Sequence, residues 1–267
     1  MKLIFLLLTL SGFTFVKSQQ LNPVIAKIDT AGDKPKLRLL SVPGITGEKN
    51  HLIKSLIIPA GLVSYGLVAL GNNHLKQLNN STKLEIREDH LTFATHLDNY
   101  LQYTPAVAVY GLNAFGIQGK SSFRDRTLVY VLANAISAAF VLPLKKITKI
   151  QRPDGSGFNS FPSGHTTTAF AAAEFMRMEY KDASPWYGVA GYVVAATTAV
   201  LRLYNNKHWV SDVVAGAGFG MLSTKLAYLA YPSIKRKFFK NKAVSSFVMP
   251  FYQNSSTGLL LVYTFKH

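Results

Sequence analysis

Long stretches without a charged side chain dominate the sequence after residue 54 and limit the folds open to it. Each is close to the length that a bilayer span requires, and the Gly and Ala within them permit helices to pack closely. Only 16% of all residues are charged, against about 25% in soluble domains, which favours a membrane protein. The stretches are Ser55–Gly71, Asn99–Gly119, Thr127–Leu144, Ala183–Leu201 and Val213–Tyr231, the last interrupted by Lys225.

Together with a shorter helix over Thr166–Met178, these stretches predict an all-α, membrane-embedded bundle of about six helices. The segment Lys83–Leu97 places apolar residues on one face and charges elsewhere, which predicts an amphipathic surface helix. Pro59 makes Ser55–Gly71 the weakest candidate for a full membrane span. A soluble protein, in which the same stretches are buried core helices, is the alternative.

The two ends of the chain differ from this helical region. Residues 1–18 combine Lys2, an apolar run and a small-residue cleavage site, which is typical of a secretory signal peptide, with an uncleaved anchor as the alternative. Residues 19–54 are expected to form an exposed lead-in segment, and 55–232 the helical domain. Residues 233–267 begin with a basic tail and end in two strand-like segments, Phe247–Tyr252 and Gly258–Phe265, which predict a terminal β-hairpin.

The net charge of +16 indicates an anionic partner. No nucleic-acid-binding module is present, and long apolar runs separate the basic residues, so a lipid surface or a phosphorylated substrate is favoured over nucleic acid. The chain has no cysteine, which excludes disulfides and thiolate metal sites.

Polar residues cluster at three places between Lys145 and Asp212. In the third cluster His208 and Asp212 are four residues apart, so they lie on one face of a helix that begins near Lys207. The Asp212 carboxylate can then accept a hydrogen bond from one nitrogen of the His208 imidazole. The other imidazole nitrogen stays free as a base or nucleophile. A solvated helix start would give the same pattern.

The second cluster, residues 160–166, precedes an Ala-rich helical stretch. Ser163 is a credible N-cap, and the amides of Gly164 and His165 would form an anion pocket at the positive end of the helix. His165, at the mouth of that pocket, could donate a proton to a leaving oxygen. A capped helix without a ligand is the simpler alternative.

The first cluster, Lys145 and Arg152, and the later Arg202 add three cations at apolar-to-polar boundaries, where basic side chains also commonly snorkel. Helix order favours a site, because in an up-and-down bundle all three clusters lie at the same end. Three cations, a helix N-terminus and two histidines are what in-line phosphoryl transfer requires.

Taken together, the three clusters resemble the three-part signature of the type 2 phosphatidic acid phosphatase (PAP2) superfamily. This superfamily includes lipid phosphatases, bacterial class A acid phosphatases and vanadium haloperoxidases, and the similarity covers roughly Leu128–Tyr231. One departure is Leu201, where the family often has a small residue before the arginine, which affects only a minor phosphate contact. The matching motifs are Lys145-x6-Arg152-Pro153, Pro162-Ser163-Gly164-His165 and Arg202-x5-His208-x3-Asp212.

The resemblance implies a helical bundle of the PAP2 and vanadium haloperoxidase type, in the exported or membrane-bound bacterial lipid phosphatase branch. It also implies that His208 attacks phosphorus to form a phosphohistidine, that Asp212 holds its ring and that His165 protonates the leaving alcohol. No metal or other cofactor is implied. The phosphoryl oxygens would be bound by Lys145, Arg152, Ser163, Gly164 and Arg202.

The candidate substrates are a lipid A phosphate, a polyprenyl diphosphate and phosphatidic-type lipids. A soluble periplasmic acid phosphatase, a vanadium haloperoxidase and a non-catalytic lipid-binding membrane protein are the alternatives. Basic loop residues at the opposite end of the bundle predict an inner-membrane protein whose site faces the periplasm. A cleaved signal peptide followed by three spans would place the site inside, so the first apolar run is expected not to span fully.

Overall fold

The computed structural model describes residues 54–238, 246–253 and 256–263, and the predicted signal peptide and nearly all of the lead-in segment lie outside them. Within the described residues the chain forms eight helices followed by two strands. This confirms the predicted helical class and the terminal hairpin. The elements are α2 Ile57–Gly71, α3 Asn73–Asp89, α4 Asp98–Leu101, α5 Thr104–Ala114, α6 Phe123–Thr148, α7 Gly164–Tyr180, α8 Pro185–Tyr204, α9 Val210–Phe238, β1 Ser246–Gln253 and β2 Ser256–Tyr263.

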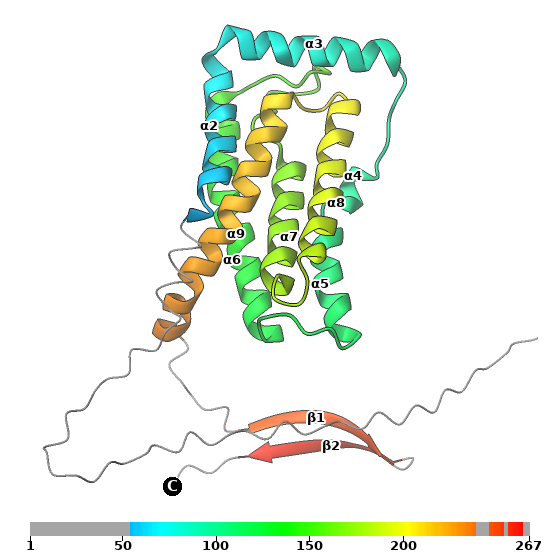
Figure 1. Cartoon of the computed structure of the whole chain (residues 1–267), viewed down its shortest axis with the longest axis vertical. Helices are drawn as coiled ribbons and strands as arrows, with labels where there is room; N and C mark the ends of the chain where they lie inside the picture. Colours follow the sequence, from blue (N-terminus) through cyan, green and yellow to red (C-terminus); the bar gives the residue numbers. More distant parts are fainter. Residues whose placement is uncertain (1–53, 239–245, 254–255, 264–267) are drawn as a thin grey trace, which may run out of the picture. The chain divides into compact units, whose positions relative to one another are not determined.

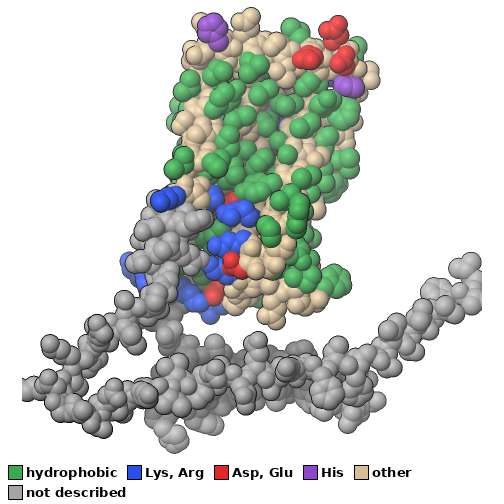
Figure 2. Space-filling model, in the orientation of Figure 1, with side chains coloured by type: hydrophobic (Ala, Val, Ile, Leu, Met, Phe, Trp, Pro, Cys, Tyr) green, Lys and Arg blue, Asp and Glu red, His purple; other side chains and the backbone are tan. Residues whose placement is uncertain are grey.

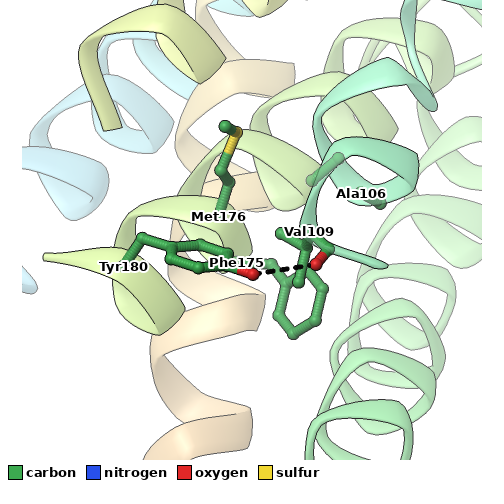
Figure 3. Close-up of a cluster of buried hydrophobic side chains, with 6 residues drawn as sticks. Ala106, Val109, Phe175, Met176 and Tyr180 are labelled. Carbon is green, nitrogen blue, oxygen red and sulfur yellow. Dashed lines mark hydrogen bonds between the residues drawn. The ribbon is translucent and has the colours of Figure 1, made fainter. Parts of the chain in front are cut away.

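The helix α7 is the centre of the bundle. It packs against α5, α6, α8 and α9, while α2 lies along α9 and α3 crosses one end of the bundle (Figure 1). Most residues of α7 are buried, including Phe175 and Tyr180, which pack against Val109 of α5 (Figure 3). The Tyr180 hydroxyl donates a hydrogen bond to the Val109 carbonyl at 2.9 Å, so the polar end of this buried ring is satisfied.

Three glycines of α9, at every second position, let this helix approach its neighbours closely. A Cβ at Gly216 would lie 2.7 Å from the Ser163 carbonyl oxygen, and one at Gly220 would lie 2.3 Å from the Thr167 carbonyl oxygen. Gly218 faces the other way, where a Cβ would be 2.7 Å from the Pro59 carbonyl oxygen of α2. Only a residue without Cβ fits at these contacts.

Gly220→Ala is therefore expected to destabilise the bundle by about 1–3 kcal/mol, because α7 backbone atoms must move to admit the methyl group. The measurement is the thermal unfolding midpoint of the purified protein. Gly61→Ala is the matched control, since a Cβ at that helical glycine meets nothing within 4 Å. The control should be neutral or slightly stabilising, and equal midpoints for the two variants would contradict the packing argument.

The prediction of about six helices was wrong in its details between residues 73 and 119. The amphipathic helix expected at Lys83–Leu97 instead runs over Asn73–Asp89 as α3. The apolar stretch Asn99–Gly119 is divided into α4 and α5, and the eleven-residue α5 is only about 16 Å long, too short for a bilayer span. Pro105 at the start of α5 and Gly116 with positive φ beyond its end set these limits.

Among the described residues, two helices, α6 and α9, are long and apolar enough to cross a bilayer, and α2 is apolar but shorter. The helix α8 has 20 residues but is not among them. Hydrophobic side chains cover the middle of one face of the bundle, with acidic side chains and histidines at one end and Lys and Arg, beside further acidic side chains, at the other (Figure 2). This distribution fits a bundle that crosses an apolar layer.

The strands β1 and β2 pair in antiparallel register, with Ser246 opposite Tyr263 and Gln253 opposite Ser256. Their bounds extend the predicted segments by one residue at each end of β1 and by two at the start of β2. The predicted boundary at residues 232 and 233 falls inside α9, which continues through Pro232 to Phe238.

Candidate functional site

The three clusters meet at one end of the bundle, as the helix order predicts. The C-terminal turn of α6, the N-terminus of α7 and the connection from α8 to α9 all lie there (Figure 1). Hydrogen bonds between the clusters fix this convergence. The Ser163 amide donates to the Asp212 carbonyl at 3.0 Å, which joins the start of α7 to the start of α9.

His208 and Asp212 form a buried pair, 3% and 1% exposed. His208 Nδ1 lies 3.5 Å from Asp212 Oδ2. The same carboxylate oxygen accepts from the Ser160 hydroxyl at 2.5 Å and from the Trp209 amide at 2.9 Å. These contacts hold the carboxylate beside Nδ1 of the imidazole, so Nε2 is the ring nitrogen left for chemistry.

The expectation that His208 and Asp212 share one helical face was wrong, because α9 begins only at Val210. His208 lies in the preceding loop, and Asp212 lies in the first turn of the helix. Its carboxylate reaches back to the Trp209 amide, as an acidic side chain does when it satisfies a free N–H at a helix start. The pair therefore forms through the helix terminus rather than through i,i+4 spacing.

Ser163 is the N-cap of α7, as predicted, and its hydroxyl accepts from the Thr166 amide at 3.4 Å. Gly164 and His165 are the first two residues of the helix, so their amides have no partner within it. Both are half-buried. The helix N-terminus therefore offers N–H donors and a positive dipole end at the site.

Lys145, in the last turn of α6, and Arg152, in the connection from α6 to α7, approach the same place, and both are half-buried. Lys145 Nζ donates to the Asn159 carbonyl at 2.6 Å, and Arg152 Nε donates to Asn159 Oδ1 at 2.9 Å. A Cβ at Gly164 would lie 4.0 Å from Lys145 Cε, so the lysine side chain passes beside the start of α7. Asn159 thus positions both cations.

Arg202 is 6% exposed and forms a salt bridge that no motif in the sequence indicates. Its Nη1 lies 2.5 Å from Asp98 Oδ2 of α4, and Asp98 is 1% exposed. His165 has an unpredicted partner as well, because its Nε2 lies 2.8 Å from Asn99 Oδ1. Asp98 is an isolated acid directly before an uncharged stretch, and that isolation is the one sequence signal that could have marked it.

The electrostatic environment of His208 favours a neutral imidazole. Burial lowers the pKa of His208 to about 4, against the opposing effect of Asp212, and the charges of Arg202 and Lys145 lower it further. The ring is therefore unprotonated near pH 7, with the Nε2 lone pair available for attack.

Over the described ranges, no group of three or more His, Cys, Asp or Glu side chains gathers where it could hold a metal ion. The polar groups that converge here are instead three cations, the N-terminus of a helix and two imidazoles, which suit an anion.

Residues 126–236 match the sequence profile of the PAP2 superfamily. The chain carries a PAP2 superfamily domain. This match contains all eight predicted site residues and agrees with the resemblance drawn from the three motifs. The chain is also 44% identical over 138 residues to the lipid A 1-phosphatase of Porphyromonas gingivalis, a match that covers 51% of this chain and 31% of that relative.

Two solved structures are similar in part. One is a transmembrane PAP2 type phosphatidylglycerolphosphate phosphatase from Bacillus subtilis, with a TM-score of 0.48, 22% identity and coverage of 67% of this chain and 98% of that chain. The other is LpxE from Aquifex aeolicus, with a TM-score of 0.42, 19% identity and coverage of 54% and 92%.

Proposed function

We propose that this protein is a phosphatase that hydrolyses the phosphate or diphosphate ester of a lipid through a phosphohistidine. The observation that carries the proposal is the convergence of two imidazoles, three cations and the α7 N-terminus at one end of the bundle, with one imidazole held by a buried carboxylate. The PAP2 profile and the 44% identical lipid A 1-phosphatase support it.

In the first step, His208 Nε2 attacks phosphorus. A P–N bond forms while the bond from phosphorus to the lipid oxygen breaks, and His165 gives that oxygen a proton so that it leaves as an alcohol. Asp212 holds Nδ1–H and stabilises the positive charge that develops on the His208 ring. The Ser160 hydroxyl, 2.5 Å from Asp212 Oδ2, keeps the carboxylate in place.

In the second step, water attacks phosphorus and the P–N bond breaks. His165, now neutral, takes the proton from the water, which returns both histidines to their starting states. Through both steps the negative charge of the phosphoryl oxygens is balanced by preorganised donors. These are the side chains of Lys145, Arg152, Ser163 and Arg202 and the Gly164 amide.

The same proposal places the protein in the bacterial inner membrane with the site facing the periplasm. Basic residues lie at both ends of the bundle. We take as the cytoplasmic flank those at the end opposite the site, at the start of α6 and the ends of α7 and α9, because Lys and Arg favour the cytoplasmic side. They are Lys120, Arg124, Arg126, Arg177, Lys181, Lys235, Arg236 and Lys237. Such a site would meet lipid headgroups at the outer surface of that membrane.

A lipid A phosphate is the first substrate to assay, because the 44% identical relative is named as a lipid A 1-phosphatase. The matched segment spans about a third of that relative, so the assay also includes phosphatidic acid, phosphatidylglycerol phosphate and a polyprenyl diphosphate. The measurement is inorganic phosphate released by the purified full chain in detergent micelles without added metal.

Release from at least one of these lipids is the expected result. If phosphate is released only from soluble esters, and carbonate extracts the protein from membranes without detergent, the soluble acid phosphatase is favoured instead. If the protein binds a lipid phosphate but releases nothing, it is a non-catalytic lipid-binding protein, and the proposal is wrong.

A further inference from the structure

The first two residues of α4 contact two of the proposed site residues. Asp98 Oδ2 accepts from Arg202 Nη1 at 2.5 Å, and Asn205 Nδ2 donates to the same oxygen at 3.3 Å. The next residue, Asn99, has its Oδ1 2.8 Å from His165 Nε2. One short helix, more than 60 residues before His165 in the sequence, thus holds a cation from α8 and an imidazole from α7.

The salt bridge leaves part of the guanidinium available. Arg202 Nε is buried and has no hydrogen-bond partner within the described part of the chain, whereas Nη1 is held by Asp98. Because the guanidinium is planar and rigid, holding one nitrogen fixes the direction of the other N–H groups. A buried N–H donor such as Arg202 Nε that lacks an acceptor costs free energy, and a hydrogen bond to a phosphoryl oxygen would remove that cost. Asp98 therefore prepares Arg202 for an anion.

The contact to His165 is different, because its partner is a neutral amide. The charged and titratable groups that face His165 are Arg202 from α8, Asp98 from α4, and His208 and Arg152 from the connecting loops. An amide in hydrogen-bond contact orients the ring without adding negative charge, whereas a carboxylate in the same place would favour the imidazolium. Asn99 thus affects both the direction and the basicity of the ring.

We propose that Asp98 and Asn99 are positioning residues: Asp98 holds the Arg202 guanidinium for the phosphoryl group, and Asn99 sets the orientation and basicity of the proton donor His165. This inference rests on the proposed phosphatase function. It assigns a role in the reaction to α4, a segment outside the matched residues 126–236.

Asn99→Asp tests the contact to His165. The substitution preserves side-chain shape at an exposed residue, so the fold should persist. A carboxylate against the ring should move the alkaline limb of the kcat pH profile upward by about one pH unit, because the donor stays protonated to higher pH. Asn73→Asp is the matched control, because it places the same charge at the start of α3 and should leave the limb unchanged.

Asp98→Asn tests the contact to Arg202, with inorganic phosphate as the probe. The inhibition constant of phosphate should rise about tenfold, while kcat falls less than the affinity for phosphate. If Asp98→Asn does not fold, Asp98→Glu replaces it, since it keeps the charge but displaces it by one methylene. That variant keeps a carboxylate as countercharge for Arg202, so it should fold, and it should still bind phosphate more weakly.

The two proposals fail in different ways. A wild-type protein that releases no phosphate from any lipid overturns the proposed function. In an active enzyme, a pH profile of Asn99→Asp that superimposes on the wild type overturns the role of Asn99. An unchanged inhibition constant in a folded Asp98 variant overturns the role of Asp98.

Discussion

His208→Ala is expected to abolish phosphate release, lowering kcat by about 10⁴-fold or more, because the proposed mechanism forms the P–N bond at His208 Nε2. The fold should persist. The Asp212 carboxylate keeps its bonds from the Ser160 hydroxyl and the Trp209 amide, so the substitution leaves no buried charge without a partner. The measurement is turnover of the best lipid substrate, with the melting temperature recorded beside it.

His74→Ala is the matched control, because His74 is exposed on α3 and belongs to none of the three clusters. It should turn over substrate at the wild-type rate. When the wild-type enzyme reacts with a substrate labelled at phosphorus and the reaction is quenched rapidly, acid-labile labelled phosphate should be found bound to the protein. The His208→Ala variant should carry none. Near wild-type turnover by a folded His208→Ala variant would exclude the phosphohistidine mechanism.

The sequence predicted that the three clusters meet at one end of the bundle, because motif spacing and helix order act together. Polar clusters at helix ends meet wherever neighbouring helices run in opposite directions, and this holds for the connections after α6 and after α8. What spacing alone could not provide is the start of α9. The spacing of four residues between His208 and Asp212 is the same whether or not His208 is helical. In the structure the helix begins after His208, so the contact depends on the hydrogen bond that the Asp212 carboxylate accepts from the Trp209 amide at the helix start.

The partners of Arg202 and His165 could not be predicted from the sequence. Asp98 is 104 residues from Arg202, and no periodicity connects them. Hydropathy also treated Asn99–Gly119 as one run, although Pro105 begins a new helix and the chain must turn there to bring Asp98 and Asn99 to the site. Tertiary contacts of this kind decide where an apolar stretch is broken.

Lys225 shows a further limit of hydropathy. In the sequence it is an interruption of an apolar run, but in the structure it is 5% exposed, with Nζ 2.6 Å from Glu174 Oε1 of α7. Arg177 Nε and the Tyr192 hydroxyl both donate to Glu174 Oε2. The carboxylate, fully buried, therefore accepts hydrogen bonds from donors on three helices, α7, α8 and α9.

Glu174→Gln should accordingly destabilise the protein by about 3–5 kcal/mol, because it leaves the buried Lys225 ammonium without a countercharge. The measurement is the free energy of unfolding from chemical denaturation in detergent micelles. Asp125→Asn is the matched control: it makes the same acid-to-amide change in an ion pair whose Lys235 side chain is 50% exposed, and such pairs contribute at most about 1 kcal/mol.

The double variant Glu174→Gln/Lys225→Met separates the loss of a contact from the burial of an unpaired charge. Since methionine fills the space of the lysine stem without its charge, the double variant should recover most of the stability that Glu174→Gln loses. If the double variant is as unstable as the single one, the cost lies in packing or in the bonds from Arg177 and Tyr192. If Glu174→Gln costs no more than Asp125→Asn, the buried pair does not stabilise the contact of α7 with α9.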